Sequence, residues 1–122
     1  MKKILIVDDE PNIVMSLEYL FKKEGFQVFI ARDGEEALAT IAQNIPDIVL
    51  LDVMMPKVDG YQVIKHLKET EKLKGIKVIF LSAKSKVTDI EKGLGLGADK
   101  YIAKPFSTKK LVKEVKELVN RN

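Results

Sequence analysis

The chain has 122 residues, 46% of them hydrophobic, with 21 Lys and Arg against 18 Asp and Glu and a formal net charge of +3. This length suits one domain, and the hydrophobic content excludes a disordered polyelectrolyte. The absence of Cys excludes disulfides, Cys–zinc sites and thiol nucleophiles. The apolar runs are far shorter than the roughly 20 residues of a membrane-spanning helix. Met1-Lys2-Lys3 leads straight into an apolar run without a signal-peptide pattern. We therefore expect a single domain over residues 1–122, cytoplasmic and without membrane contact.

The small positive charge raises the question of nucleic-acid binding. Such binders cluster their cations and mix in arginine and aromatic residues. Here the only arginines are Arg32 and Arg121, Trp is absent, and the lysines are spread along the whole chain. This pattern favours a solvated lysine surface, and we expect no direct nucleic-acid binding by this domain.

Five short apolar runs alternate with five segments of helical periodicity. The runs are, in chain order, Ile4–Val7, Val28–Ala31, Ile48–Leu51, Val78–Leu81 and Tyr101–Ala103. The helical segments are marked by Ile13, Leu17, Leu20 and Phe21, with Gly25 as a stop signal, then by Ala37–Ala42, Val63–Leu67, Val87–Leu94 and Leu111–Val119. This alternation predicts an α/β fold, in which a doubly wound, five-stranded parallel sheet is covered by five helices. A barrel typically needs about twice this length.

Candidate site residues follow four of the five runs. They are Asp8, Asp9 and Glu10 after the first run, Asp52 after the third, Ser82 after the fourth, and Lys104 with Pro105 after the fifth. In a doubly wound sheet the ligand site lies at the carboxyl ends of the strands, so these residues are expected at one edge. Clustered carboxylates without His or Cys suit Mg²⁺, with Mn²⁺ as an alternative ion. A carboxylate beside such an ion can attack phosphorus and form an aspartyl phosphate, whose oxygens Lys104 and Ser82 could bind.

Each of these residues alone also has an ordinary interpretation. An Asp or a Ser after a strand is often a helix cap, and a lone lysine usually lies on the surface. Asp33-Gly34 and Asp59-Gly60 are interpreted as turns without a catalytic role. The glycine-rich stretch 93–97 follows a helical segment and does not open one, so it does not fit a dinucleotide loop; we expect the fourth helix to fray or end early there. His66, the only histidine, is expected on the surface.

The motifs together resemble the receiver domain of two-component response regulators, the chemotaxis-type fold, over essentially the whole chain. They are Val7-Asp8-Asp9-Glu10, Leu51-Asp52-Val53-Met54-Met55-Pro56 with Asp59-Gly60, Leu81-Ser82-Ala83, and Lys104-Pro105-Phe106. The resemblance implies a flavodoxin-like sheet with strand order 2-1-3-4-5 and a cis peptide bond before Pro105. It makes Asp52 the phosphoacceptor for a histidine kinase or a histidine phosphotransfer protein. It assigns Asp8, Asp9, Asp52 and the backbone carbonyl of Met54 to the magnesium ion.

The resemblance also implies a switch. Ser82 is the hydroxyl drawn toward the phosphoryl group, Lys104 the lysine of the site, and Tyr101 the aromatic ring that then turns inward. The face formed by the fourth helix, the fifth strand and the fifth helix changes for a downstream protein target or an output domain. Met54 and Lys84 stand at the two positions that tune how water reaches the acyl phosphate. An apolar Met54 predicts slow self-dephosphorylation.

Several alternatives stay open. The chain is expected to be a phosphoacceptor signalling domain that assists its own phosphorylation and dephosphorylation, and not an enzyme with a separate substrate. The alternatives are a magnesium-dependent aspartyl-phosphate phosphatase of the haloacid-dehalogenase type and an interaction module that is never phosphorylated. Asp99-Lys100 replaces a pair of acids common in dimerising receivers, so a monomer or a weak, phosphorylation-dependent dimer is expected. The sequence does not decide between a stand-alone receiver and a piece of a longer protein.

Overall fold

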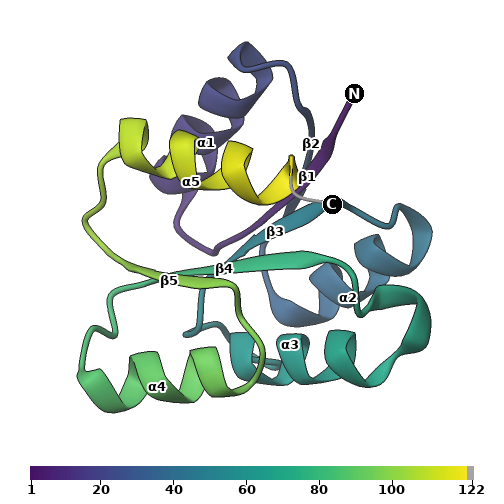
Figure 1. The fold of residues 1–122 in the computed structure, drawn as a ribbon, viewed down its shortest axis with the longest axis vertical. Helices are drawn as coiled ribbons and strands as arrows, with labels where there is room; N and C mark the ends of the chain where they lie inside the picture. Colours follow the sequence, from purple (N-terminus) through teal and green to yellow (C-terminus); the bar gives the residue numbers. More distant parts are fainter. Residues whose placement is uncertain (121–122) are drawn as a thin grey trace.

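The apolar runs form the five strands of one sheet in the computed structural model, which describes residues 1–120 (Figure 1). The strands are β1 (Lys3–Val7), β2 (Gln27–Ala31), β3 (Ile48–Leu51), β4 (Lys77–Ser82) and β5 (Lys100–Ala103). The helices are α1 (Pro11–Lys23), α2 (Gly34–Gln43), α3 (Gly60–Glu69), α4 (Val87–Gly95) and α5 (Thr108–Val119), with a short 3₁₀ turn, η1 (Glu71–Leu73). The alternation predicted from the apolar periodicity is therefore confirmed. Residues 121 and 122, including Arg121, lie outside the described part.

The strand order is β2-β1-β3-β4-β5 and every neighbouring pair is parallel, as predicted. From β1 the chain crosses to β2 on one side and then to β3 on the other, so the topology reverses between β1 and β3. Ligand sites of such sheets lie outside the strand ends at this reversal. Val7 pairs with Leu51 in the register, so the residues that follow these two strands meet at the same edge.

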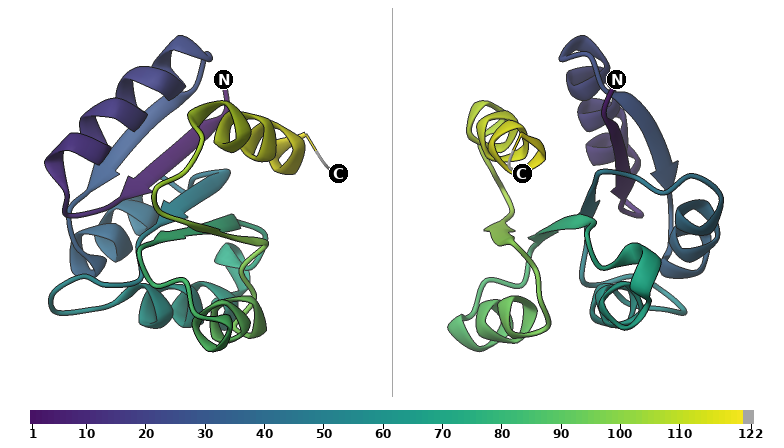
Figure 2. Two further views of the ribbon diagram at one scale, coloured as in Figure 1. Left: turned by 90° about the vertical axis from the view of Figure 1, so that its left-hand side faces the viewer. Right: turned by 45° about the vertical axis from the view of Figure 1, so that its right-hand side comes forward.

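Alternating side chains of the strands build two separate cores. Leu5 and Val7 of β1 face one core, which α2 and α3 close with Ala37, Ile41 and Leu67, among others. Ile4 and Ile6 face the other, which α1 and α5 close with residues such as Leu17 and Leu111. Figure 1 shows α1 and α5 together on one side of the sheet and α2, α3 and α4 on the other. The edge at β5 is flanked by α4 on one side and α5 on the other (Figure 2).

Short polar residues and glycines set the helix ends. Asp33 and Asp59, interpreted as turn residues from the sequence, instead cap α2 and α3: their carboxylates accept the backbone N–H groups of Glu36 and Gln62. Gly25 has a positive φ of 90° just after α1, as its role of stop signal predicted. Gly97, with φ 110°, does the same after α4. The helix α4 continues through Gly93 and Gly95, and whether it frays stays a prediction.

The helices of the described residues are short. Within residues 1–120, no helix is both long and apolar enough to cross a bilayer. The longest, α1, has 13 residues, whereas a spanning helix needs about 20.

Candidate phosphoryl-transfer site

The pairing of β1 with β3 brings Asp8 and Asp52 together. The backbone N–H of Asp52 donates to the carbonyl of Val7 at 3.0 Å, which continues the ladder past the last paired residues. Both acids are buried, with 2% of Asp8 and 5% of Asp52 exposed. Asp8 and Asp9 do not cap α1, because Glu10 directly precedes that helix and no side chain caps it. The interpretation of Asp8 and Asp9 as caps is therefore wrong.

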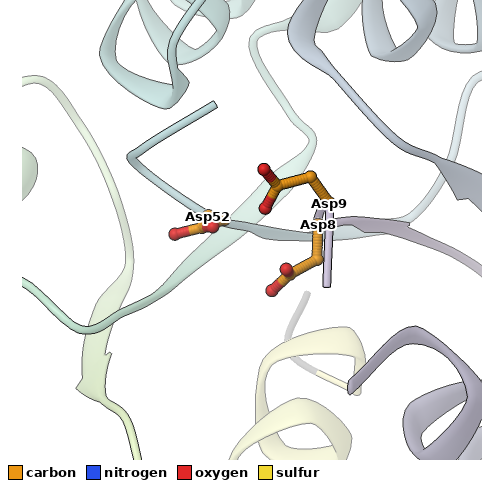
Figure 3. A group of neighbouring side chains, drawn as sticks. All are labelled: Asp8, Asp9 and Asp52. Carbon is orange, nitrogen blue, oxygen red and sulfur yellow. The ribbon is translucent and has the colours of Figure 1, made fainter. Parts of the chain in front are cut away.

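Asp9 completes a cluster of three carboxylates at this edge. Asp8, Asp9 and Asp52 each offer an oxygen, and these oxygens lie within 4.8 Å of one another (Figure 3). Asp8 and Asp52 are buried, whereas Asp9 is exposed, so the cluster is open on the side of Asp9. A set of oxygen ligands that leaves one side to water suits Mg²⁺, which keeps several of its waters. The donor set fits the ion that the motifs imply.

The ammonium of Lys104 lies beside two acids of this cluster, Asp8 and Asp52. Its Nζ is 2.8 Å from Oδ2 of Asp8, 3.1 Å from Oε1 of Glu10 and 3.7 Å from Oδ2 of Asp52. Only 9% of its side chain is exposed, so the interpretation as a surface lysine is wrong. Burial works against the charge, but the hydrogen bonds to Asp8 and Glu10 outweigh it and raise the pKa of Lys104. The lysine therefore stays charged and offsets the carboxylates. The peptide bond to Pro105 is cis, as predicted.

Asp52 binds protons more tightly than an ordinary aspartate. Burial is the largest cause and raises the pKa of Asp52 to about 6. The negative charges of Asp8 and Asp9 add to this, whereas Lys104 and a backbone hydrogen bond from Met54 act in the opposite direction. A carboxylate held in this way is ionised at neutral pH but remains poorly solvated, as a nucleophile requires.

The segment after β3 stays close to Asp52 because Gly60 has no side chain. A Cβ built on Gly60 would lie 2.3 Å from the backbone oxygen of Asp52, a distance no side chain tolerates. Met54, in this segment, is 60% exposed and its side chain reaches solvent. The position two residues beyond Asp52 thus carries an apolar side chain that is open to water.

Lys84, in the segment after β4, is hydrogen-bonded to both Ser82 and Tyr101. Ser82 is buried, and its hydroxyl accepts the backbone N–H of Lys84 at 3.1 Å. It does not cap α4, because Lys86 precedes that helix and makes no side-chain cap. The hydroxyl of Tyr101 donates to the carbonyl of Lys84 at 2.7 Å. The tyrosine ring packs on Phe80 of β4, with centroids 5.6 Å apart.

Two side chains near the site carry roles that the sequence did not assign. Glu10 was noted only as an acid after the first strand, but it is the second hydrogen-bond partner of Lys104. Tyr61 packs edge-on against Phe80, and its hydroxyl donates to the carbonyl of Asp89 in α4 at 3.3 Å. In the sequence, the only hint of this contact is that Tyr61 directly follows Asp59-Gly60, where α3 begins. His66 is exposed on α3, away from the strand ends, as expected.

Comparison with known proteins gives the family. The model of the response regulator receiver domain matches residues 4–116. The chain is 43% identical over 121 residues to the alkaline phosphatase synthesis transcriptional regulatory protein PhoP of Bacillus subtilis (strain 168), covering 99% of this chain and 50% of PhoP. It therefore spans about half the length of that curated relative.

Solved structures agree with this match. A putative response regulator from Chloroflexus aurantiacus has a TM-score of 0.93 and 35% identity, covering 98% of both chains. The receiver domain of a sensor histidine kinase from Pseudomonas aeruginosa PAO1, with a magnesium ion coordinated in its active-site cleft, has a TM-score of 0.90 and 27% identity, covering 98% of both chains. With the acidic cluster and its lysine at the sheet edge, the chain belongs to the response regulator receiver domain family of two-component systems.

Proposed function

We propose that Asp52 accepts a phosphoryl group from the histidine of a kinase or of a phosphotransfer protein. The observation that carries this proposal is the position of the Lys104 ammonium between the buried carboxylates of Asp8 and Asp52. This arrangement supplies a nucleophile together with a fixed positive charge for the oxygens of the transferred group. The family match favours it over the haloacid-dehalogenase-type alternative.

The chemistry assigns a task to each residue. An oxygen of Asp52 attacks phosphorus, a P–O bond forms, the P–N bond to histidine breaks, and the imidazole leaves with the bonding electrons. Asp8, Asp9, Asp52 and the carbonyl of Met54 would hold the magnesium ion, which supplies neutralising charge for the phosphoryl oxygens. Lys104 and the hydroxyl of Ser82 would each bind one of those oxygens. That Mn²⁺ can replace Mg²⁺ stays a prediction.

The switch would run from Ser82 to the face formed by α4, β5 and α5. A phosphoryl group on Asp52 would attract the Ser82 hydroxyl, which now accepts from Lys84. The carbonyl of Lys84 also binds Tyr101, so a movement of this segment reaches β5. We propose that a downstream protein or an output domain reads this face. The relative of twice the length is named a transcriptional regulator, and that activity belongs to the whole relative.

The charges of Asp99 and Lys100, at the start of β5, are engaged within the chain. Lys100 forms an ion pair with Glu114 of α5. The carboxylate of Asp99 accepts the backbone N–H of Val78 at 2.8 Å. These pairs leave fewer free charges for a second copy, which supports our proposal of a monomer or of a weak dimer that depends on phosphorylation.

The direct test is incubation with Mg²⁺ and a small acyl phosphate, followed by intact-mass measurement. We expect a gain of one phosphoryl group, which disappears with EDTA and in Asp52→Asn. The matched control is Asp33→Asn, which replaces an acid outside the site by a residue that also caps a helix. A gain that persists in Asp52→Asn, or no gain with any donor, would contradict the proposal and favour a module that is never phosphorylated.

A further inference from the structure

Gly93 occupies an unusual place for a glycine. It lies inside α4, two residues before the helix ends, and its surroundings bury it. Glycine is among the least favourable residues in a helix interior, and α4 contains a second one, Gly95. The two differ in their surroundings: a Cβ on Gly95 would meet no atom within 4 Å. Packing therefore gives a reason for the glycine at position 93 but none for the one at position 95.

The room left by Gly93 is filled by the Tyr101 ring. A Cβ built on Gly93 would lie 2.9 Å from Cδ2 and 3.1 Å from Cε2 of Tyr101. It would also lie 3.0 Å from Cδ2 of Phe80, on which the Tyr101 ring packs. Carbon atoms in contact prefer about 3.5–4.0 Å, so even one methyl group would force a ring to move. Phe80 is fully buried in the sheet, whereas Tyr101 is only half-buried on the edge strand β5, so the tyrosine ring is the one expected to move.

The position of this ring matters because of what its hydroxyl holds. The hydroxyl of Tyr101 donates to the carbonyl of Lys84, whose N–H in turn donates to the Ser82 hydroxyl. A ring seated against Gly93 is thus joined to the segment that begins at Ser82. A ring displaced from Gly93 would lose the hydrogen bond to Lys84 and, with it, this connection.

We propose that Gly93 is a positioning residue for the switch, because its missing side chain provides the slot in α4 in which the Tyr101 ring lies. The role in the switch rests on the proposed function, whereas the packing of Tyr101 against Gly93 does not depend on phosphorylation. Gly93→Ala shifts the ring outward and weakens the response of the α4–β5–α5 face to phosphorylation. Asp52 remains able to accept the phosphoryl group, because no atom of the site is replaced.

The test compares Gly93→Ala with Gly95→Ala, the same substitution in the same helix without a neighbour. In nuclear magnetic resonance spectra, Gly93→Ala should shift the Tyr101 ring signals and remove their contacts with Phe80, whereas Gly95→Ala should leave both unchanged. Upon phosphorylation, the shift changes of amides in α4 and β5 should fall several-fold in Gly93→Ala only. Unchanged ring contacts in Gly93→Ala would overturn the proposal.

A double substitution separates the ring from the helix. In the unaltered background, Gly93→Ala should lower the thermal unfolding midpoint because the ring is displaced. In a Tyr101→Ala background, the same change should lower the midpoint clearly less or not at all, because only the contact with Phe80 at 3.0 Å remains and alanine is the better helix former. If Gly93→Ala changed the midpoint equally in both backgrounds, the Tyr101 ring would not occupy the space left by Gly93, and the proposal would be wrong. Intact mass of each variant measures phosphorylation separately. A failure of the unaltered chain to accept a phosphoryl group would contradict the proposed function, whereas the ring signals and the unfolding midpoints would still test the packing of Tyr101 against Gly93.

Discussion

The ammonium nitrogen of Lys104 lies 2.8 Å from a carboxylate oxygen of Asp8, although 96 positions separate the two residues in the chain. Both side chains are buried, so the pair replaces water around each charge. Removing one partner of a buried ion pair leaves the other charge without compensation. Lys104 therefore stabilises the site as well as serving the proposed phosphoryl transfer.

Lys104→Ala should lower the free energy of unfolding at pH 7 by about 3 kcal/mol, a typical cost of breaking a buried ion pair. The pKa of Asp52 should rise above about 6, because Lys104 is the main influence that lowers it. Urea unfolding measures the first effect, and a carboxylate titration by nuclear magnetic resonance measures the second. Lys84→Ala, which removes a more exposed lysine near the same edge, is the control. Equal losses in the two variants would contradict a special role of Lys104.

Asp52→Asn should make the protein more stable at pH 7. The pKa of Asp52 is raised to about 6, so the folded state binds its proton more tightly than the unfolded chain does. Stability from this group is therefore present in acid and is lost as the pH rises from about 4 to about 6. One pKa unit corresponds to about 1.4 kcal/mol, so the ionised Asp52 costs at most about 3 kcal/mol at pH 7.

The gain in Asp52→Asn should accordingly shrink as the pH falls from about 6 toward 4, because Asp52 of the folded state then takes up its proton and no longer carries a buried charge. Urea unfolding at pH 4, 5, 6 and 7 without divalent ions measures this gain in the free energy of unfolding. Asp33→Asn, which replaces an acid outside the site, is again the control. A gain that does not depend on pH would show that the charge of Asp52 is not its cause.

The sequence was sufficient for the fold and for bringing Asp8, Asp9, Asp52 and Lys104 to one edge of the sheet. Consecutive apolar residues such as Ile48–Leu51 identify a strand buried on both faces, and its end identifies Asp52. Asp8, Ser82 and Lys104 follow in the same way, because parallel strands all end at one edge. Asp33 and Asp59 were misread as turns, since an Asp–Gly pair suits both a turn and the start of a helix.

Contacts that depend on side-chain geometry could not be predicted. Glu10 is the second partner of Lys104 because both side chains are long enough to meet beyond the ends of β1 and β5, which no spacing in the chain reveals. The stretch of glycines at 93–97 suggested only a weak helix. Its buried member contacts Phe80 and Tyr101, which lie on two other elements, so its role emerges only from the packing of α4 on the sheet.

Mg²⁺ should stabilise the protein through the three carboxylates that lie within 4.8 Å of one another. A ligand that binds only the folded state at 100 times its dissociation constant adds about 2.7 kcal/mol to the free energy of unfolding. Thermal unfolding with and without MgCl₂, against NaCl of equal ionic strength, measures the effect. The shift should weaken as the pH falls below about 6, where protons compete for Asp52. Asp52→Asn should reduce it, and a full shift in that variant would place the ion elsewhere.

The phosphorylated form should lose its phosphoryl group slowly, because Met54 offers no group to position a water molecule. Met54 is 60% exposed, so a polar replacement reaches water without disturbing the core. Met54→Asn should shorten the half-life of phosphorylated Asp52 several-fold, because its amide can hydrogen-bond an attacking water. Met54→Leu, also apolar, should leave the half-life unchanged. Intact mass followed over time after removal of the donor measures all three proteins. A half-life of seconds in the unaltered chain, or equal effects of Asn and Leu, would contradict this role of Met54.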